Sequence, residues 1–427
     1  MKNRDIKEFL DRECTADAYR IIEKKTESHE LFFVHEKLET VRSTDTLDTN
    51  VTVYVDHDGS RGDSSFSVFR GMDDDVLKGK LRTAEDRAKL VFNQPYELPG
   101  PGTCEKTVEN TFGDCSLKDS AELIADTVFS APCAEGCSLN ALEVFVYRET
   151  VRIRNSRGVD KTQHKVRAAV EAIPTYTDGN GSVELYEMLK FTDLDPERIR
   201  EEIAEKMREV HDRAKAAKPE GRISCPIVLR TKEISSLLSE LAYDVNYRNV
   251  YSKANLFSVG DTVQNGDGCD KITLSAVSYV KGSDKSAAFD EDGTDLTDAV
   301  LIKDGKVESL FGSSRFGQYL NIEKPTGALP CIRLGKGTLT ESELNGIEYL
   351  ELVSLSGIQG DLFNDYLGGE IRLAYHHKDG KATPVTGITF SARLSESLNT
   401  LRLSDKVTTD GEYEGPDKLM IGSAEVI

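Results

Sequence analysis

The stretch Asp195-Pro196-Glu197-Arg198-Ile199 opens the clearest helix of the chain, and it decides how the rest of the sequence is divided. An aspartate cap followed by proline at the first helical position is a strong helix-start signal, because proline has a preset φ and its missing N–H would stay unbonded there. Further apolar residues recur at helical spacing and predict one buried face: Ile203, Met207, Val210 and Ala214. The polar segment Lys218-Pro219-Glu220-Gly221 ends this helix, and we place a domain boundary there.

Before this boundary, helical patterns alternate with pairs of strands. Helices are predicted over residues 6–24, 73–91 and 116–129. Strands are predicted over residues 31–41, 49–56, 64–69, 142–147, 151–155 and 164–172. In one of these strands Phe66 and Val68 alternate with Ser65 and Ser67, which is the period of a half-buried antiparallel strand. Residues 1–220 are therefore predicted to form an N-terminal α+β domain of antiparallel strands and helices.

After Gly221 the sequence changes to short strands separated by glycine, asparagine and aspartate. They are predicted over residues 227–229, 299–301, 350–355, 370–375 and 388–390. Asp304-Gly305 and Asp379-Gly380 each stand between two strand patterns and predict hairpin turns. Helices are expected over residues 233–247 and from Thr340, which forms a capping box with Glu343. Residues 221–427 are predicted to form a curved, mostly antiparallel sheet or partial β-barrel, so the whole chain is of the α+β class.

The composition excludes several classes of protein. The formal net charge of the 427 residues is −20, which argues against direct nucleic-acid binding because that binding relies on basic patches. Arg148, Arg152 and Arg154 are interpreted as the solvated face of a strand. No apolar signal region follows the charged start, and no apolar run approaches about 18 residues, so a cytoplasmic protein without a membrane span is expected. The eight cysteines, Cys133 and Cys137 among them, are then expected to be reduced thiols.

Common catalytic and metal motifs are missing from the sequence. There is neither a Gly-x-Ser-x-Gly elbow nor a His-Glu-x-x-His helix. His376 and His377 are adjacent in a predicted strand and should point to opposite faces, which makes one shared metal difficult. The acidic cluster over residues 290–295 lacks the spacing of a calcium loop and is interpreted as a surface loop. The residues taken alone indicate a two-domain α+β protein and no further function.

Several segments, taken in order, carry a resemblance to a known family. They are residues 151–160 (VRIRNSRGVD), 191–197 (FTDLDPE), 292–294 (DGT), 300–307 (VLIKDGKV), 353–357 (VSLSG) and 384–389 (PVTGIT). In this order and spacing they resemble the TldD/TldE (PmbA, "modulator of DNA gyrase") family of metalloproteases. The first 57 residues and the end of the chain show little of the family pattern.

The zinc motif of the family is altered in this chain. In the TldD branch a His-Glu-x-x-x-His segment binds zinc, and its glutamate serves as general base on the bound water. The matching positions here hold Ser239, Glu240 and Asp244. A serine hydroxyl is a poor zinc ligand, and positions i and i+5 lie about 140° apart around a helix. No cysteine or histidine after His377 matches the third ligand of the family. We therefore assign no catalytic residue to this chain and expect it to hold no metal or cofactor.

The resemblance implies a function through a partner. The TldE branch lacks the same motif and pairs with a TldD-like catalytic subunit, so zinc is expected in that partner. The implied complex is a heterodimeric peptidase that acts on unfolded or extended peptides, in proteolysis or peptide maturation. Two alternatives stay open: a self-sufficient hydrolase in which Glu240, Asp244 and His376 or His377 converge, and a homodimeric peptide-binding or scaffold protein.

Overall fold

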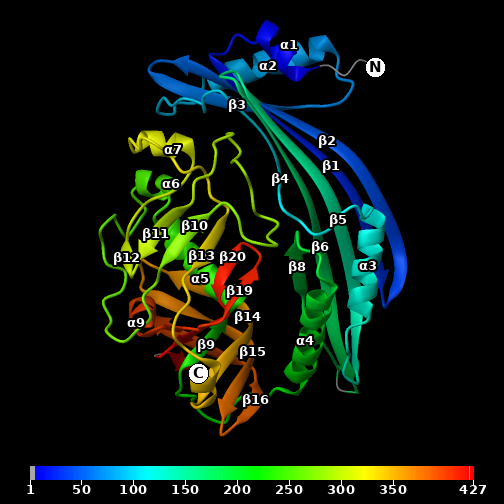
Figure 1. The fold of residues 1–427 in the computed structure, drawn as a ribbon, viewed down its shortest axis with the longest axis vertical. Coiled ribbons are helices and arrows are strands. Elements are labelled where there is room, and N and C mark those ends of the chain that lie inside the picture. Colours follow the sequence, from blue (N-terminus) through cyan, green and yellow to red (C-terminus); the bar gives the residue numbers. More distant parts are fainter. Residues whose placement is uncertain (1–4, 180, 423) are drawn as a thin grey trace.

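The computed structural model describes residues 5–179, 181–422 and 424–427 (Figure 1). It confirms the α+β class, with curled, largely antiparallel sheets. One eight-stranded sheet is built from the chain before residue 192, and two sheets with shorter strands follow from residue 227 onward. The helix that opens at Asp195 lies between the first sheet and the later part of the chain in Figure 1. No helix of the described residues is long and apolar enough to cross a membrane.

Four long strands make up most of the first sheet and sweep along the right of Figure 1. The sheet has the order β3-β2-β1-β5-β6-β4, and β7 and β8 also pair with β6. Every pairing is antiparallel except that of β4 with β6. Its strands are β1 (Ala18–Val34), β2 (Lys37–His57), β3 (Ser60–Val68), β4 (Gly102–Thr107), β5 (Cys137–Asn155), β6 (Val159–Asp178), β7 (Gly181–Glu184) and β8 (Glu187–Phe191).

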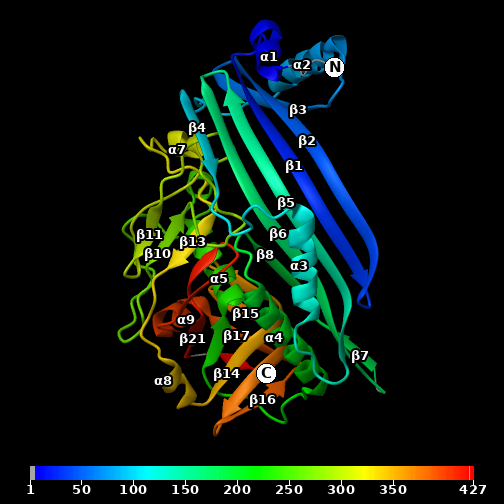
Figure 2. The ribbon, with the colours of Figure 1, turned by 45° about the vertical axis from the view of Figure 1, so that its right-hand side comes forward.

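Two pairs of helices cover this sheet at its two ends (Figures 1 and 2). At one end α1 (Ile6–Glu13) and α2 (Asp74–Ala88) bury Phe9, Leu10 and Leu77 against Ile21 of β1. At the other end α3 (Leu117–Phe129) and α4 (Pro196–Lys215) pack on β1, β5 and β6. Each end of the sheet therefore has its own apolar core. Burial of apolar surface is the main contribution to the stability of a folded protein, so both cores stabilise the sheet.

The helix predicted over residues 6–24 is wrong in its second part, because α1 ends at Glu13 and β1 begins at Ala18. The Glu85 carboxylate of α2 accepts hydrogen bonds from the backbone N–H groups of Thr15 and Ala16 at 2.7 and 3.2 Å, which fixes the turn. Beyond it, β1 pairs with β2 on one side and β5 on the other. These long-range ladders outweigh the local helical pattern.

Two further predictions in the first half need correction. The strand predicted over residues 31–41 is interrupted by a tight turn at His35 and Glu36, whose φ angles of 46° and 62° are unusual for these residue types. Arg154 is buried at 3% exposure and pairs with Asp5 and Glu23, so it is not part of a solvated face, whereas Arg148 is exposed. The turn lacks the Asn-Gly or Asp-Gly pair that usually marks a hairpin, and the burial of Arg154 depends on Asp5 and Glu23, which are distant in the sequence.

The second half contains a six-stranded and an eight-stranded sheet. The six-stranded order is β12-β11-β10-β13-β20-β19, and the other is β18-β21-β9-β14-β15-β17-β22 with β16 beside β15. The strands are β9 (Ile227–Arg230), β10 (Leu274–Val277), β11 (Ala299–Lys303), β12 (Lys306–Val307), β13 (Cys331–Leu334), β14 (Tyr349–Asp361), β15 (Tyr366–Lys378), β16 (Lys381–Val385), β17 (Ile388–Arg393), β18 (Arg402–Leu403), β19 (Val407–Asp410), β20 (Tyr413–Pro416), β21 (Lys418–Ile421) and β22 (Glu425–Val426). A bridge between Ile223 and Val426 joins the approach to β9 to β22, so the larger sheet curls into a partial barrel.

The helices of the second half are short apart from α5. They are α5 (Thr231–Asp244), α6 (Tyr247–Tyr251), α7 (Ser314–Tyr319), α8 (Glu341–Asn345) and α9 (Leu394–Thr400). Residues 233–247 do not form one helix as predicted, because α5 ends at Asp244 and Asn246 caps α6 by accepting the N–H of Arg248. The Thr340–Glu343 capping box and both Asp-Gly turns are present as predicted.

The acidic segment over residues 290–295 joins the two halves of the molecule and is not a free surface loop. Asp292 forms an ion pair with Arg20 of β1, and Asp295 accepts a bond from Lys161 of β6 at 2.7 Å. Asp290 is buried, and its carboxylate accepts the N–H groups of Asp292 and Thr294 at 3.0 and 2.9 Å. The surface-loop prediction failed because the basic partners are more than a hundred residues away in the sequence.

Candidate functional site

Helix α5 lies between the two sheets of the second half and carries the altered motif. It contacts β9, β14 and β21 on one side and β10, β19 and β20 on the other. Its apolar stripe is part of the largest core of the molecule: Ile234, Leu237, Leu238, Leu241 and Ala242. The spacing of this stripe is that of an amphipathic helix, so the sequence fixes which face of α5 is buried.

The three motif positions lie in different environments. Ser239 is half-buried, Glu240 is exposed, and Asp244 is buried at 2% exposure. The Cγ atom of Glu240 lies 3.9 Å from where a Cβ atom at Gly360 of β14 would stand. Ser239 offers only a hydroxyl, which is a poor zinc ligand, so the first histidine position of the motif supplies no ligand in this chain.

Both carboxylate oxygens of Asp244 accept backbone hydrogen bonds. Oδ1 accepts the N–H of Leu256 at 2.7 Å, and Oδ2 accepts the N–H of Phe257 at 2.9 Å. Phe257 packs against the large core, so these bonds fasten the loop after α6 to the end of α5. A buried carboxylate with both oxygens engaged in this way has a structural role.

The histidines of β15 lie at the opposite end of β14 from Glu240. His376 Nε2 lies 2.8 Å from an oxygen of Glu348, and His377 Nε2 lies 3.1 Å from an oxygen of Glu351. The two residues pair with Leu350 and Tyr349 at the start of β14, whereas Glu240 lies beside Gly360 near its end. The structure therefore does not bring Glu240, Asp244 and either histidine together.

A buried charged cluster that the sequence analysis missed connects α4 to the second half. Arg230, at the end of β9, donates to Glu209 of α4 at 2.7 Å and to Glu351 of β14 at 2.9 Å. Lys206 also pairs with Glu209, at 2.8 Å. Burial raises the pKa of Glu351, but the charges of Arg230 and Lys418 and the hydrogen bonds from Arg230 and His377 together lower it below its usual value. Removing one member of such a buried pair would leave the charge of the other uncompensated, at a large cost in free energy. The cluster therefore stabilises the contact between α4 and the second half.

Glu233, in the first turn of α5, is buried and has its pKa raised to about 7, chiefly by burial. The folded protein then keeps a proton that the unfolded chain has lost between about pH 4.5 and 7, so stability falls as pH rises through this window.

Replacing Glu233 by glutamine removes this dependence. We expect the variant to be more stable than the parent by about 2–3 kcal/mol at pH 8 and by much less at pH 4.5. Urea unfolding at both pH values measures this, with the exposed Glu240→Gln as the matched control. An equal difference at the two pH values would contradict the assignment.

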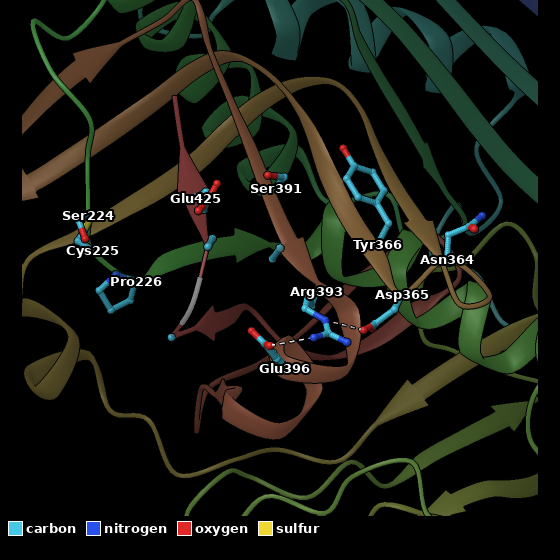
Figure 3. Close-up of a pocket in the computed structure, with 13 residues that line it drawn as sticks. Ser224, Cys225, Pro226, Asn364, Asp365, Tyr366, Ser391, Arg393, Glu396 and Glu425 are labelled. Atoms are coloured by element: carbon cyan, nitrogen blue, oxygen red, sulfur yellow. Dashed lines mark hydrogen bonds and ion pairs between the residues drawn. The ribbon is translucent and has the colours of Figure 1, made fainter.

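A cavity of about 730 Å³ opens at one end of the partial barrel (Figure 3). Residues that precede β9, the β14–β15 turn and the ends of β17 and β22 line it. Arg393 bonds Asp365 at 2.9 Å and lies 3.6 Å from Glu396, as the dashed lines of Figure 3 show. Its lining mixes charged side chains with apolar ones such as Pro226 and Ala392.

The chain is similar to one protein family and to several solved structures. Residues 222–427 match the family model of the PmbA/TldA metallopeptidase C-terminal domain. The fold resembles that of TldE from Thermococcus kodakarensis, with a TM-score of 0.77 and 15% identity over 98% of this chain and 97% of that one. No protein of curated function matches the chain by sequence.

Two proposed modulators of DNA gyrase have the same fold. The protein from Thermotoga maritima has a TM-score of 0.73 and 17% identity over 99% of this chain and 100% of its own. The protein from Bacteroides thetaiotaomicron has a TM-score of 0.76 and 14% identity over 98% of this chain and 96% of its own. The solved structures show that the fold extends over the whole chain, and the family model that residues 222–427 match gives the assignment: the chain belongs to the TldD/TldE (PmbA) family of metallopeptidase-like proteins.

Proposed function

We propose that this chain is a TldE-like, non-catalytic subunit that pairs with a TldD-like, zinc-bearing chain to form a peptidase for unfolded or extended peptides. The observation that carries the proposal is the environment of the Asp244 side chain. It stands at the second histidine position of the motif, is buried, and gives both carboxylate oxygens to backbone N–H groups. With Ser239 at the first histidine position, α5 offers no pair of ligands for a hydrolytic zinc ion.

An exposed strand edge supports the pairing part of the proposal. β3 pairs with β2 only along residues 49–57, and no other strand of the described residues pairs with the outer edge of residues 37–48. Leu38, Val41 and Leu47 of this segment are 51, 50 and 55% exposed. A free edge with exposed apolar side chains can accept a further strand, either from a partner subunit or from an extended peptide.

Placing charge on this edge should weaken the complex. We expect Leu38→Lys combined with Val41→Lys to reduce affinity for the TldD-like chain by at least about tenfold, because burying each apolar side chain is worth about 1.5–3 kcal/mol. Light-scattering mass over a dilution series measures the affinity. The control is Leu90→Lys, a change at a leucine that is 77% exposed beyond α2. Equal affinities of the two variants would exclude this edge from the interface.

The two alternatives differ in how they fit the structure. A self-sufficient hydrolase needs Glu240, Asp244 and a β15 histidine in one place, and these residues lie apart. A homodimeric peptide-binding protein would use the same free edge of β2, with a second copy as its partner. The mass of the purified chain distinguishes this case. A stable homodimer that does not bind the TldD-like chain would support the homodimeric protein and contradict the proposed heterodimer.

A further inference from the structure

Three potential metal ligands from distant parts of the sequence converge at one end of the partial barrel. They are the Sγ atom of Cys225, a carboxylate oxygen of Glu348 and a ring nitrogen of His376, and all lie within 4.8 Å of one another. Each of the three residues is half-buried. This cluster is distinct from the α5 motif, and none of its members is used by the proposed peptidase role.

Strand register explains why these side chains share one face. Leu350 of β14 is opposite Ile227 of β9 on one side and His376 of β15 on the other. Cys225 stands two residues before Ile227, and Glu348 stands two residues before Leu350. The N–H of Leu350 donates to the carbonyl of Pro226 at 2.9 Å, so the pairing of the two strands continues toward Cys225. Because side chains alternate with a period of two, all three ligands point to the same side of the sheet.

His377, one residue further along β15, lies on the opposite face. Its ring stacks on Tyr349 at 4.2 Å between centroids and bonds Glu351. The sheet ladders on both sides of β15 fix this alternation, since His376 pairs with Leu350 and Thr383. The cluster therefore stands on rigid strands, which is how a ligand set is pre-organised.

We infer that Cys225, Glu348 and His376 form a binding site for a zinc-class divalent transition-metal ion. Ligand atoms around a tetrahedral zinc ion lie about 3.5 Å apart, so a set within 4.8 Å closes with shifts of about 1 Å. Thiolate, carboxylate and neutral imidazole balance the charge of a divalent cation. A thiolate and an imidazole favour zinc, cobalt or copper over the hard cations magnesium and calcium.

One coordination position of this site is left for water or a ligand. Three protein ligands leave the fourth tetrahedral position open. Cys225 lines the cavity of about 730 Å³, and Glu348 lines a second cavity of about 340 Å³, so solvent reaches both ligands. Lys378, which bonds Glu348 at 3.1 Å, is more than half exposed and can turn into solvent when the metal replaces it.

Metal binding at this site should release a proton from the thiol. A cysteine thiol ordinarily titrates at about pH 8.5, so a metal-free cysteine is largely protonated at neutral pH. Since only the thiolate binds metal, the apparent affinity should rise about tenfold per pH unit between pH 6 and 8 once other protonation changes are corrected for.

Cobalt(II) titration of the full-length chain, purified with a chelator and then freed of it, tests the inference. We expect about one equivalent to bind with an absorption band characteristic of thiolate-to-cobalt charge transfer, and zinc to displace it. Cys225→Ser should abolish the band, and His376→Gln should weaken binding by more than about 100-fold, since loss of an outer-shell partner alone costs 10–100-fold. Cys133→Ser and His377→Gln are the matched controls and should bind like the parent.

Two results would overturn the inference. One is a charge-transfer band that survives Cys225→Ser or disappears in Cys133→Ser, which would place the bound metal near Cys133 and Cys137. The other is the absence of any cobalt band in a chain whose thermal unfolding shows that it is folded. Both readouts are independent of peptidase activity, so they do not depend on the proposed subunit role.

Discussion

Replacing Asp244 by alanine is expected to lower the free energy of unfolding by about 3–4 kcal/mol. The change removes two charge-assisted hydrogen bonds, each worth about 1.5–3 kcal/mol, and leaves the N–H groups of Leu256 and Phe257 without their acceptor. Asp244→Asn keeps one carbonyl oxygen and should lose about half as much. Urea unfolding of the metal-free chain measures both changes.

Glu240→Ala is the control for this experiment. Glu240 is exposed on the same helix, and substitutions at such positions usually change stability by less than about 0.5 kcal/mol. If Asp244→Ala were no more destabilising than Glu240→Ala, the carboxylate would not be structural. The presence of a carboxylate at this position of the motif would then have to be explained by binding.

The second large effect concerns the buried cluster between the two halves. Arg230→Ala is expected to destabilise the chain by about 3 kcal/mol, because Glu209 and Glu351, at 2 and 9% side-chain exposure, lose their shared cation. We place the loss at the low end of the range for broken buried pairs, since Lys206 still pairs with Glu209 and His377 with Glu351. Thermal and urea unfolding measure it.

A double variant sharpens this test. Adding Glu209→Gln to Arg230→Ala removes one of the uncompensated charges, so the double variant should be more stable than the sum of the two single changes predicts. Arg148→Ala serves as control, because that arginine is exposed and makes one bond of 3.3 Å with Glu27. Simple additivity of the two changes would contradict the account of the cluster.

The sequence predicted the elements whose signals are local. The Asp195 cap accepts the N–H groups of Glu197 and Arg198 as expected, and the Thr340 capping box forms. The Asp-Gly turns have positive φ at both residues, which is the geometry that favours this dipeptide. Each of these features depends on residues within about four positions of one another.

Several of the failures share a physical cause, which is pairing between distant residues, whereas the turn at His35 and the break of the predicted helix at Asn246 are local. β1 replaced a predicted helix because two long strands pair with it, and Arg154 is buried because Asp5 and Glu23 lie beside it. The spacing of Cys225, Glu348 and His376 in the sequence gives no sign of a metal site, because only the register of the strands brings these residues together. The motif positions were located through the family resemblance, whereas the backbone bonds of Asp244 appear only in the structure.

The proposed non-catalytic role is tested most directly by peptide hydrolysis. The activity is measured for this chain, for its TldD-like partner and for the mixture of the two. An unfolded peptide substrate is used, with and without chelator, and with variants in which the histidines of the partner's zinc motif are replaced. The account predicts that efficient, chelator-sensitive hydrolysis needs both chains, is abolished by the partner's histidine replacements, and is unchanged by Glu240→Ala in this chain. Chelator-sensitive hydrolysis by this chain alone, lost on Glu240→Ala, would contradict it.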